Sequence, residues 1–539
     1  MIKGEETFRT NGYERPIKSV CPECKRAIRG FIYEEDGKIY MRKWCAQHGE
    51  FHDIIHVNAR VYQWNQRFLK DGLKVDKPER QTLKGCPHDC GLCPNHISTP
   101  AICLIDLTNR CNLKCPICFA NANVRGYTVE PPFEEIVRIM EHFRSITPNP
   151  PLTLQLSGGE PTVRDDLIEI VRKGAELGFK HIMLTTNGLR LAESIDYCRR
   201  LAEAGVNAVY LQFDGTHPEA YVRTRGRDLL DIKKRAIENW GKVIDEWRDS
   251  YGKPPGGIVL VPTIAKGVND REIPSIIDFA VAHIGTVVGI VFQPIAMCGR
   301  FDRNSIHEMR FTSSELQGRV DAHTMGVLNP WYPISAISEF ARLVDWFDNV
   351  ATVEFSCHPD CGFANWLIID DETGELRGLK HYLDIDGGLA YSCETWRKIV
   401  SEGREWKAGW LHRKVKKIRY FLGIRRFVRK KGHIYALLRR MILSPSYESA
   451  EAFMFGRNLM IGSMHFQDPH NMDLERVRRC LVHYGYVDSE GKVRQVPFCT
   501  MNAIHRERIE EEIARRLGAF PDLKQKHEEQ APLIRVPTR

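Results

Sequence analysis

The residues best suited to chemistry are three cysteines, Cys111, Cys115 and Cys118, which lie within eight positions of one another. The apolar run at 102–107 stands just before them and predicts a buried strand. Thiolates in a loop that follows a strand are typical of an iron–sulfur cluster. Three ligands leave one iron of a [4Fe–4S] cube without a protein ligand, and an open metal position supports catalysis. A zinc knuckle or three buried free cysteines are the alternatives.

A glycine-rich stretch, SGGEP, follows a second apolar run at 152–157. A Gly-Gly pair alone predicts only a turn. In this order, however, Cys-x3-Cys-x2-Cys and Gly-Gly-Glu-Pro resemble the radical S-adenosylmethionine (radical SAM) superfamily. The resemblance implies that the three cysteines hold the cluster and are catalytic, and that the open iron binds the amino and carboxylate groups of SAM. It also implies a cofactor-binding role for Ser157, Gly158, Gly159, Glu160 and Pro161.

These motifs sit in a stretch where strands and helices alternate, from residue 101 to residue 296. Apolar runs predict six strands, at 102–107, 152–157, 181–186, 207–213, 257–263 and 288–293. Amphipathic patterns predict helices near 133–145, 165–178, 190–204, 217–246 and 270–284. Such repeats form a parallel sheet with right-handed crossovers, so the fold class is α/β. The resemblance implies a partial (β/α)6 TIM-type barrel.

Polar residues follow several of these strands, where the ligands of such a barrel belong. The resemblance assigns Asn187, Gln212 and Asp214 to contacts with SAM or the substrate. Arg223, a little further on, suits the SAM carboxylate or an anionic substrate. An ordinary loop or cap role is the alternative for each residue.

The N-terminal segment carries a separate set of metal ligands: Cys21, Cys24, Cys45 and His48. Two short knuckles joined by a predicted hairpin form a rubredoxin-like or zinc-ribbon module. Three thiolates and one imidazole suit one Zn or Fe ion. A domain this small rarely folds without such a staple. We therefore favour a structural site over an electron relay.

Two more cysteine sets predict auxiliary [4Fe–4S] clusters, for a total of three. Cys86, Cys90 and Cys93 repeat the spacing of the central motif, with Cys103 as a possible fourth ligand and a zinc knuckle as the alternative. Four cysteines in the second half form a natural set for the third cluster: Cys357, Cys361, Cys480 and Cys499.

Composition limits the class and the compartment. The 539 residues are 43% apolar and 27% charged, which indicates a globular chain of two to four domains. Neither a signal peptide nor an 18-residue apolar window is visible, and the Cys-x2-Cys spacings suit metals in a reducing cytosol. The predicted regions are a rubredoxin-like module at 1–58, an auxiliary iron–sulfur segment at 59–100, the radical SAM barrel at 101–296, an auxiliary cluster region at 297–405, a basic amphipathic segment at 406–447, and a C-terminal α+β cluster-binding region with a polar tail at 448–539.

The basic segment at 406–447 contains no acidic residue, and twelve Lys and Arg fall within 413–440. Apolar residues recur in it at helical spacing. A basic amphipathic helix suits an anionic membrane surface, so we predict peripheral membrane association of a cytoplasmic protein. A helix packed on the barrel is the alternative. No RNA-binding motif accompanies the segment, and we predict no nucleic-acid partner.

Taken together, five stretches resemble the archaeal tetraether lipid synthases and their bacterial relatives: the rubredoxin-like start, CPHDCGLC, TNRCNLKCPICFA, CHPDC, and MHFQDPHNMDLERVRRC followed by PFC. The resemblance implies carbon–carbon bond formation between terminal methyl ends of lipid chains through a 5′-deoxyadenosyl radical. It also implies a lipid substrate and an external, unidentified reductant. The alternatives are radical SAM methylation of a pterin precursor and, from another class, a multi-cluster electron carrier.

Overall fold

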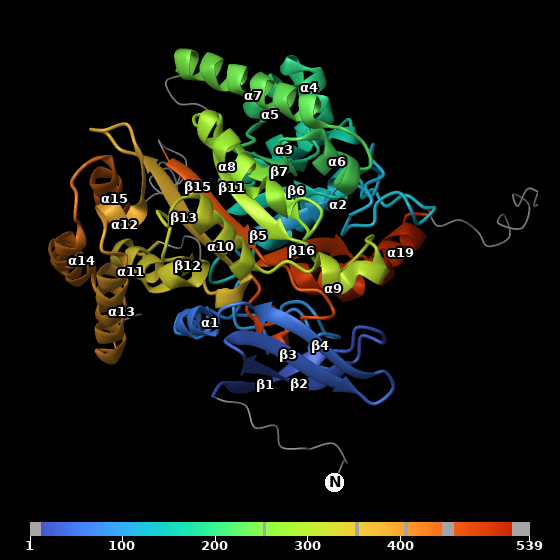
Figure 1. Ribbon diagram of the computed structural model, residues 1–539, viewed down its shortest axis with the longest axis horizontal. Helices are drawn as coiled ribbons and strands as arrows, with labels where there is room; N and C mark the ends of the chain where they lie inside the picture. The colour runs from blue at the N-terminus through green and yellow to red at the C-terminus, as the bar shows by residue number, and fades with distance from the viewer. Residues whose placement is uncertain (1–11, 252–254, 351–354, 404–407, 445–457, 520–539) are drawn as a thin grey trace, which may run out of the picture.

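The computed structural model describes residues 12–251, 255–350, 355–403, 408–444 and 458–519. A small N-terminal sheet lies beneath a large central sheet, and a group of helices flanks the central sheet at the left edge of Figure 1. Helices α3, α5 and α7 lie above the central sheet in the same view. The predicted polar tail at 520–539 lies outside the described residues.

The N-terminal module is an antiparallel sheet in the order β1-β2-β3-β4. Its hairpin turns at Asp36 and Gly37, whose φ values of 49° and 72° are those of a two-residue hairpin loop. The predicted hairpin is therefore present. A minimal core around Ile32 and Met41 includes Tyr62 from the following helix. The elements are β1 (Glu14–Val20), β2 (Ala27–Glu35), β3 (Lys38–Cys45), β4 (Gly49–His56) and α1 (Ala59–Gln66).

The six predicted strands of the α/β core are all present and run parallel to one another in chain order. Their apolar sequences follow from burial, because a parallel sheet is covered on both faces. They are β5 (Ile102–Asp106), β6 (Thr153–Ser157), β7 (His181–Thr186), β8 (Ala208–Gln212), β9 (Ile258–Val261) and β11 (Val287–Pro294).

Helices join these strands and pack on one face of the sheet. Leu154 and Leu184 of the sheet meet Ile170, Leu201 and Ile237 of the helices in one apolar core. The connections are α2 (Phe133–Arg144), η1 (Pro161–Val163), α3 (Leu167–Glu176), α4 (Leu189–Glu193), α5 (Ile195–Ala204), α6 (Pro218–Arg225), α7 (Leu230–Tyr251), η2 (Asp270–Glu272) and α8 (Ile273–Ala282).

The second half of the chain adds strands to both edges of this sheet, a feature that the sequence analysis did not predict. β15 (Asn458–Met464) pairs in parallel with β11, and β16 (Val482–Val487) pairs in parallel with β5. The edges of a six-stranded unit would leave a row of unpaired backbone groups, which these strands cover. The remaining strands are β10 (Thr263–Ile264) beside β11, β12 (Tyr332–Pro333), β13 (Gly362–Ile369), β14 (Leu376–Gly378) and β17 (Val493–Pro497).

Three of the helices after residue 297, α11, α13 and α14, enclose a separate apolar core around Leu343, Tyr420 and Ile424, which we call the satellite core. None of the helices in the described ranges has the length and apolarity to span a bilayer. The elements are η3 (Arg303–Ser305), α9 (Ile306–Met309), α10 (Ser313–His323), η4 (Ile334–Ile337), α11 (Ser338–Asp348), η5 (Pro359–Cys361), α12 (Leu379–Tyr382), α13 (Ile385–Ser401), α14 (Trp410–Ile424), η6 (Arg425–Phe427), α15 (His433–Leu443), α17 (Leu474–Val477), α18 (Phe498–Thr500), the π-helix η7 (Met501–His505) and α19 (Arg506–Arg516).

Candidate metal centres and active site

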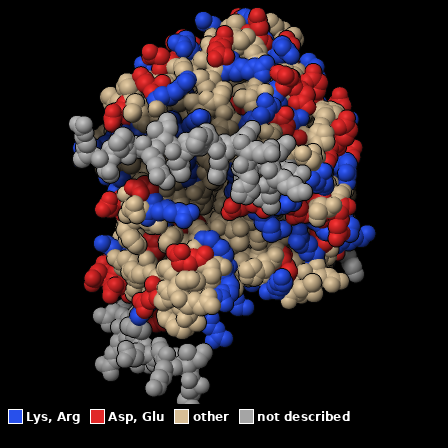
Figure 2. All heavy atoms as spheres, turned by 90° about the vertical axis from the view of Figure 1, so that its right-hand side faces the viewer, with Lys and Arg blue, Asp and Glu red and all other residues tan. Residues whose placement is uncertain are grey.

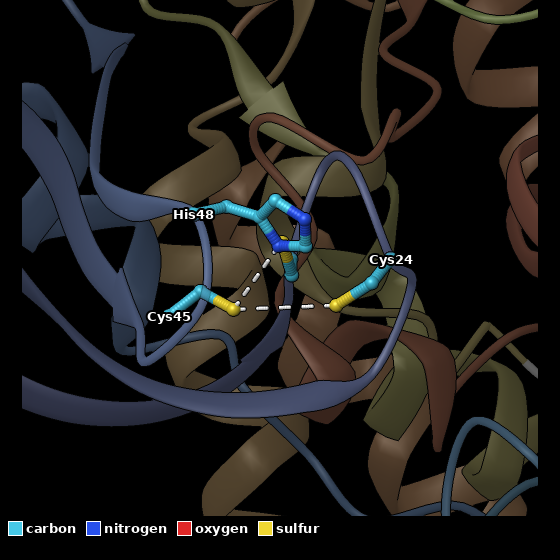
Figure 3. A group of neighbouring side chains, drawn as sticks. Cys24, Cys45 and His48 are labelled. Carbon is cyan, nitrogen blue, oxygen red and sulfur yellow. Dashed lines mark hydrogen bonds between the residues drawn. The ribbon is translucent and has the colours of Figure 1, made fainter.

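The N-terminal module brings its four predicted ligands together at the ends of β1 and β3. The ligand atoms of Cys21, Cys24, Cys45 and His48 all lie within 4.8 Å of one another. The His48 Nδ1 is 3.5 Å from the Cys45 Sγ, and the Cys24 and Cys45 sulfurs are 4.0 Å apart (Figure 3). A tetrahedral ion with metal–sulfur bonds of about 2.3 Å sets its ligand atoms roughly 3.8 Å apart. The donor set and its spacing therefore fit one Zn ion.

A nearby arginine prepares one of these thiols for a metal. The Arg26 Nε donates a 3.4 Å hydrogen bond to the Cys24 sulfur. This bond lowers the pKa of Cys24 to about 6, so the thiolate that binds metals is favoured at neutral pH. The module is also tied to the body of the protein, since the Lys43 Nζ donates to the Pro469 carbonyl at 2.6 Å.

The loop with Cys111, Cys115 and Cys118 follows β5 as predicted, and side chains far away in the sequence hold its backbone. The Asn123 Oδ1 accepts from the Cys111 N–H at 3.0 Å. The Arg300 Nε donates to the Cys115 carbonyl at 2.6 Å, while the backbone of Arg300 pairs with that of Cys118. Burial raises the pKa of Cys111 to about 12. These contacts fix the course of the loop backbone.

The turn after β6 presses directly against this loop. The N–H of Gly159 donates to the Thr108 carbonyl at 2.7 Å, and the N–H of Glu160 donates to the Arg110 carbonyl at 2.9 Å. A Cβ atom at Gly158 would lie 2.3 Å from the Thr108 carbonyl oxygen. Only glycine permits this approach, and Gly158 also has a φ of 130°. The Gly-Gly pair therefore fits a role in cradling a cluster-bound group at the loop.

The Glu160 carboxylate links the turn after β6 to the end of β7 through hydrogen bonds. Its oxygens accept from the Thr186 hydroxyl and from the N–H of Asn187, both at 2.7 Å. The Asn187 amide in turn donates to the Asn112 side chain in the cysteine loop at 2.7 Å. Asn187 is therefore placed beside the candidate cluster site, where the sequence predicted a SAM or substrate contact.

Asp214 anchors a buried ion pair at the carboxyl end of β8. Its carboxylate is fully buried, and the Arg225 Nη2 donates to it at 2.8 Å. The Arg225 Nη1 also donates to the Ile117 carbonyl at 3.2 Å, within the cysteine loop. The Asp214 carboxylate raises the pKa of Arg225 against the effect of burial. The pair holds the loop against the sheet.

Arg225, rather than Arg223, is therefore the arginine of α6 that reaches the cysteine loop. Arg223 is exposed, and its Nη1 donates to the carbonyls of Gly267 and Val268. The two residues lie on opposite sides of α6, because they are two positions apart on a helix. No spacing rule distinguishes them in the sequence.

Lys233 is a second residue that the sequence analysis missed. Its ammonium group is buried and donates to the Gln212 side chain at 2.7 Å and to the Asn187 carbonyl. Burial lowers the pKa of Lys233 to about 7. The sequence analysis selected Gln212 and Asn187 as site residues because they follow strands. Both accept hydrogen bonds from the buried Lys233.

In the second triplet, the structure brings Cys86 and Cys90 together and leaves Cys103 elsewhere. A hydrogen bond with the Cys86 thiol, together with burial, raises the pKa of Cys90, and the nearby His505 imidazole lowers it in part. His505 is buried on η7, and its Nε2 lies 2.9 Å from the Pro87 carbonyl oxygen. Cys93 is also buried.

Cys103 lies on β5 and packs in the main apolar core beside Leu154. Burial alone raises its pKa, without a neighbouring thiol. Alternate residues of a strand point to opposite faces of the sheet. Leu104 packs with Cys90 and Tyr484 on one face, so the side chain of Cys103 faces the helices on the other. The side chains that the structure brings to Cys90 include the Thr500 hydroxyl, 2.9 Å from its sulfur, and the His505 imidazole, neither of which a cysteine spacing could reveal.

Cys357, Cys361, Cys480 and Cys499 come from three separate stretches of the chain and lie near one another in the structure. Burial and the neighbouring thiols of Cys361 and Cys480 raise the pKa of Cys357. Burial raises the pKa of Cys499 to about 11, and its sulfur accepts from the N–H of Gln467 at 3.3 Å. Among the described residues, the N-terminal set is the only group of three or more candidate ligands whose ligand atoms all lie within 4.8 Å of one another. The cysteines of a [4Fe–4S] cluster bind different iron atoms, so their sulfurs lie farther apart than the ligands of a single ion.

Two family models match the chain. The model of the radical SAM superfamily matches residues 105–280, and the model of the HMPTM N-terminal zinc ribbon domain matches residues 13–57. The predicted radical SAM core is therefore confirmed, together with an N-terminal zinc ribbon. A [4Fe–4S] cluster and SAM are the cofactors expected of this superfamily.

Two curated relatives differ in how much of the chain they cover. The 7,8-dihydro-6-hydroxymethylpterin dimethyltransferase of Methanocaldococcus jannaschii is 39% identical over 505 residues, which are 93% of this chain and 96% of that protein. A probable GTP 3′,8-cyclase of Methanothermobacter marburgensis is 35% identical over 189 residues, which are 35% of this chain and 55% of that protein.

Among solved structures, Streptococcus suis SuiB bound to its precursor peptide SuiA covers 43% of this chain and 48% of its own length. It has a TM-score of 0.33 and 19% sequence identity.

The long relative corrects the function expected from the sequence. The protein that matches almost end to end is named as a pterin dimethyltransferase, so the predicted carbon–carbon bond formation between lipid chains is wrong. The shared motifs misled because they hold clusters and SAM, which many reactions use. The chain belongs to the radical SAM superfamily, in the same family as the 7,8-dihydro-6-hydroxymethylpterin dimethyltransferase of Methanocaldococcus jannaschii.

Proposed function

We propose that the protein is a radical SAM methyltransferase whose substrate is a 6-hydroxymethyl-7,8-dihydropterin. The observation that carries this proposal is the 39% identity to a pterin dimethyltransferase over nearly the full length of both chains. The cysteine loop with its Gly-Gly turn supplies the site at which SAM would bind. Cys111, Cys115 and Cys118 would hold the cluster.

Polar groups on the inner face of the sheet along β6 and β7 support a small polar substrate, whereas valines such as Val259 and Val291 line that face along β9 and β11. Along β6 to β8, leucines such as Leu156 and Leu211 face the helices. On the opposite face, the Gln155 side chain donates to the Thr185 hydroxyl at 2.9 Å. At the carboxyl end of β8, the Gln212 Oε1 accepts from the Lys233 Nζ of α7 at 2.7 Å. Amide and hydroxyl groups at the carboxyl ends of strands suit the hydrogen-bonding edges of a pterin.

The protein residues position and isolate the reacting groups. With cluster and SAM bound, the cofactors supply one-electron cleavage of SAM to a 5′-deoxyadenosyl radical, which can remove hydrogen from an unactivated carbon. Asp214 and Arg225 hold the cysteine loop at the sheet. Gly158 and Gly159 keep the loop and the turn after β6 in contact, which limits the access of water.

We further propose two auxiliary [4Fe–4S] clusters besides the one at the cysteine loop. The first would bind Cys86, Cys90 and Cys93, and the second would bind a four-cysteine set. Support for the second comes from the interaction of its thiols at one buried place: Cys357, Cys361, Cys480 and Cys499. An external reductant would supply their electrons.

The test is an anaerobic turnover assay with reconstituted protein, dithionite, the dihydropterin and excess SAM, followed by mass spectrometry. Excess SAM is needed because a molecule cleaved to 5′-deoxyadenosine keeps its methyl group in methionine, so a second molecule would donate the methyl group. We expect 5′-deoxyadenosine together with a pterin whose mass has increased by one or two methyl groups. A Cys115→Ala variant should give neither product. Formation of 5′-deoxyadenosine with an unchanged pterin would reject the pterin as substrate.

A further inference from the structure

Helix α14 has two apolar faces, of which only one is packed. The packed face turns Tyr420 and Ile424 into the satellite core of α11 and α13. The opposite face exposes four aliphatic side chains, Leu411, Val415, Ile418 and Leu422, whose exposed fractions are 67%, 44%, 56% and 58%. Spacings of four, three and four residues align them in one stripe along the helix.

Such a stripe needs an explanation that single exposed residues do not. An amphipathic surface helix normally turns its apolar stripe to the core, but the core-facing side of α14 is already filled. Trp410, at the start of the helix, is 73% exposed and extends the apolar surface. Helix α14 lies at the left edge of the molecule in Figure 1.

Basic side chains border the stripe on both sides. On a helix of 3.6 residues per turn, Lys414 lies along one border and Arg419 along the other. Lys414 pairs with Asp348 at 3.0 Å, whereas Arg419 is exposed and has no acidic partner among the described residues. The nearest acidic residues along the chain stand outside 406–447.

The side of the molecule turned away from α14 is different. Figure 2 shows that face, where acidic and basic side chains are interspersed. Among charged residues, the α14 segment itself carries basic ones only, although Lys414 and Lys416 are paired with Asp348 and Glu402 of neighbouring elements. Its charge complements a negatively charged partner, and its aliphatic stripe requires that the partner also offers an apolar phase.

We propose that α14 docks the protein on the surface of an anionic lipid bilayer. Leu411, Ile418 and Leu422 would enter the boundary between headgroups and acyl chains, while Lys414 and Arg419 would reach the lipid phosphates. Nucleic acid fits less well, because its grooves and phosphates offer nothing to a row of aliphatic side chains. A second copy of this chain would bring two basic helices together, and like charges repel.

This inference concerns where the protein works rather than what it methylates, so it stands independently of the proposed function. The test is sedimentation of the intact, metal-loaded protein with vesicles of phosphatidylglycerol or of phosphatidylcholine. The stripe variant carries Leu411→Ser, Val415→Ser, Ile418→Ser and Leu422→Ser together. A matched control replaces two exposed residues elsewhere, Leu83→Ser and Met325→Ser, which are 82% and 90% exposed.

We expect binding to phosphatidylglycerol vesicles that falls at least about tenfold in the stripe variant and stays unchanged in the control. Arg419→Glu should weaken binding most at low salt, because surface charges are screened as ionic strength rises. Equal binding by the stripe and control variants would overturn the proposal, as would equal binding to both lipids.

Two further results would assign the stripe to another partner and so reject the membrane. One is retention of an RNA or DNA oligomer that the stripe variant loses. The other is a dimer in solution that the stripe variant converts to a monomer, without vesicle binding by either form.

Discussion

The N–H of Gly159 donates a 2.7 Å hydrogen bond to the carbonyl oxygen of Thr108, which fastens the turn after β6 to the loop that carries Cys111, Cys115 and Cys118. The contact is so close that a Cβ at Gly159 would lie 2.3 Å from the Arg110 carbonyl oxygen. The shape of the candidate cluster site therefore depends on a backbone contact between the loop after β5 and the turn after β6.

Gly159→Ala should disrupt the cluster site, since the new methyl group meets backbone that cannot move without displacing the loop. We expect a loss of iron and at least a tenfold loss of SAM cleavage, measured by metal analysis and by the yield of 5′-deoxyadenosine. Gly318→Ala in α10 is the matched control, because a Cβ there meets no atom within 4 Å. Alanine favours helix over glycine by about 1 kcal/mol, so the control should be at least as stable as the parent. Equal effects of the two changes would contradict this account of the turn.

Arg225→Met should destabilise the fold, because it leaves the buried Asp214 carboxylate without its cation. Removing one partner of a buried pair costs about 3 kcal/mol. Anaerobic urea unfolding measures this difference. Arg223→Met, two residues away, removes only exposed bonds to carbonyl groups and should cost less than about 1 kcal/mol. Similar losses in both variants would refute the positioning role of Arg225.

Lys233 should make the free energy of unfolding depend on pH between about 7 and about 10.4. Its pKa is lowered to about 7 by burial, against an unfolded value of about 10.4. Between these values the unfolded chain binds a proton that the folded protein lacks, so the free energy of unfolding rises with pH by up to about 1.4 kcal/mol per pH unit. The contribution is complete above the unfolded pKa and is lost as pH falls towards 7.

Replacement of the lysine isolates this effect from other titrating groups. Denaturant unfolding of Lys233→Met between pH 7 and 9 should show a smaller slope than the parent protein. Parallel curves for the two proteins would mean that the Lys233 ammonium stays protonated in the folded state.

His505 and Cys103 can be compared as partners of the second cysteine triplet. If His505 completes the site at Cys86, Cys90 and Cys93, His505→Ala should change the electron paramagnetic resonance spectrum of the reduced protein and lower its iron content. A nitrogen ligand raises the potential of an iron–sulfur cluster, so the parent should also be easier to reduce. Cys103→Ala should leave iron and spectrum unchanged. The reverse result would restore Cys103 as the fourth ligand.

The sequence predicted the elements whose signals are local. The knuckles at Cys21 and Cys45 and the turn at Gly37 depend on neighbouring residues, and the six core strands follow from short apolar runs. The loop with Cys111 could be recognised for the same reason, because its ligands and its strand are adjacent in the chain.

Relationships between distant segments could not be predicted in this way. The pairing of β15 and β16 with the two core edges joins residues far apart in the chain, such as Gly289 with Met460 and Ile102 with Val482. Arg225 and Arg223 have the same chemistry, and only the direction in which α6 packs separates them. The main prediction, a lipid substrate, was wrong and a pterin stood only among the alternatives, because the cluster and SAM motifs say nothing about the molecule that receives the radical.

The central claim is that the protein methylates a dihydropterin by radical chemistry. Its most direct test traces hydrogen from the pterin to 5′-deoxyadenosine. The dihydropterin is supplied with deuterium at its saturated carbons, and 5′-deoxyadenosine from an anaerobic turnover is analysed by mass spectrometry. Our account predicts deuterium in the 5′-deoxyadenosine and a methylated pterin that has lost it. Deuterium-free 5′-deoxyadenosine, formed at the same rate with and without the pterin, together with an unmodified pterin, would contradict it.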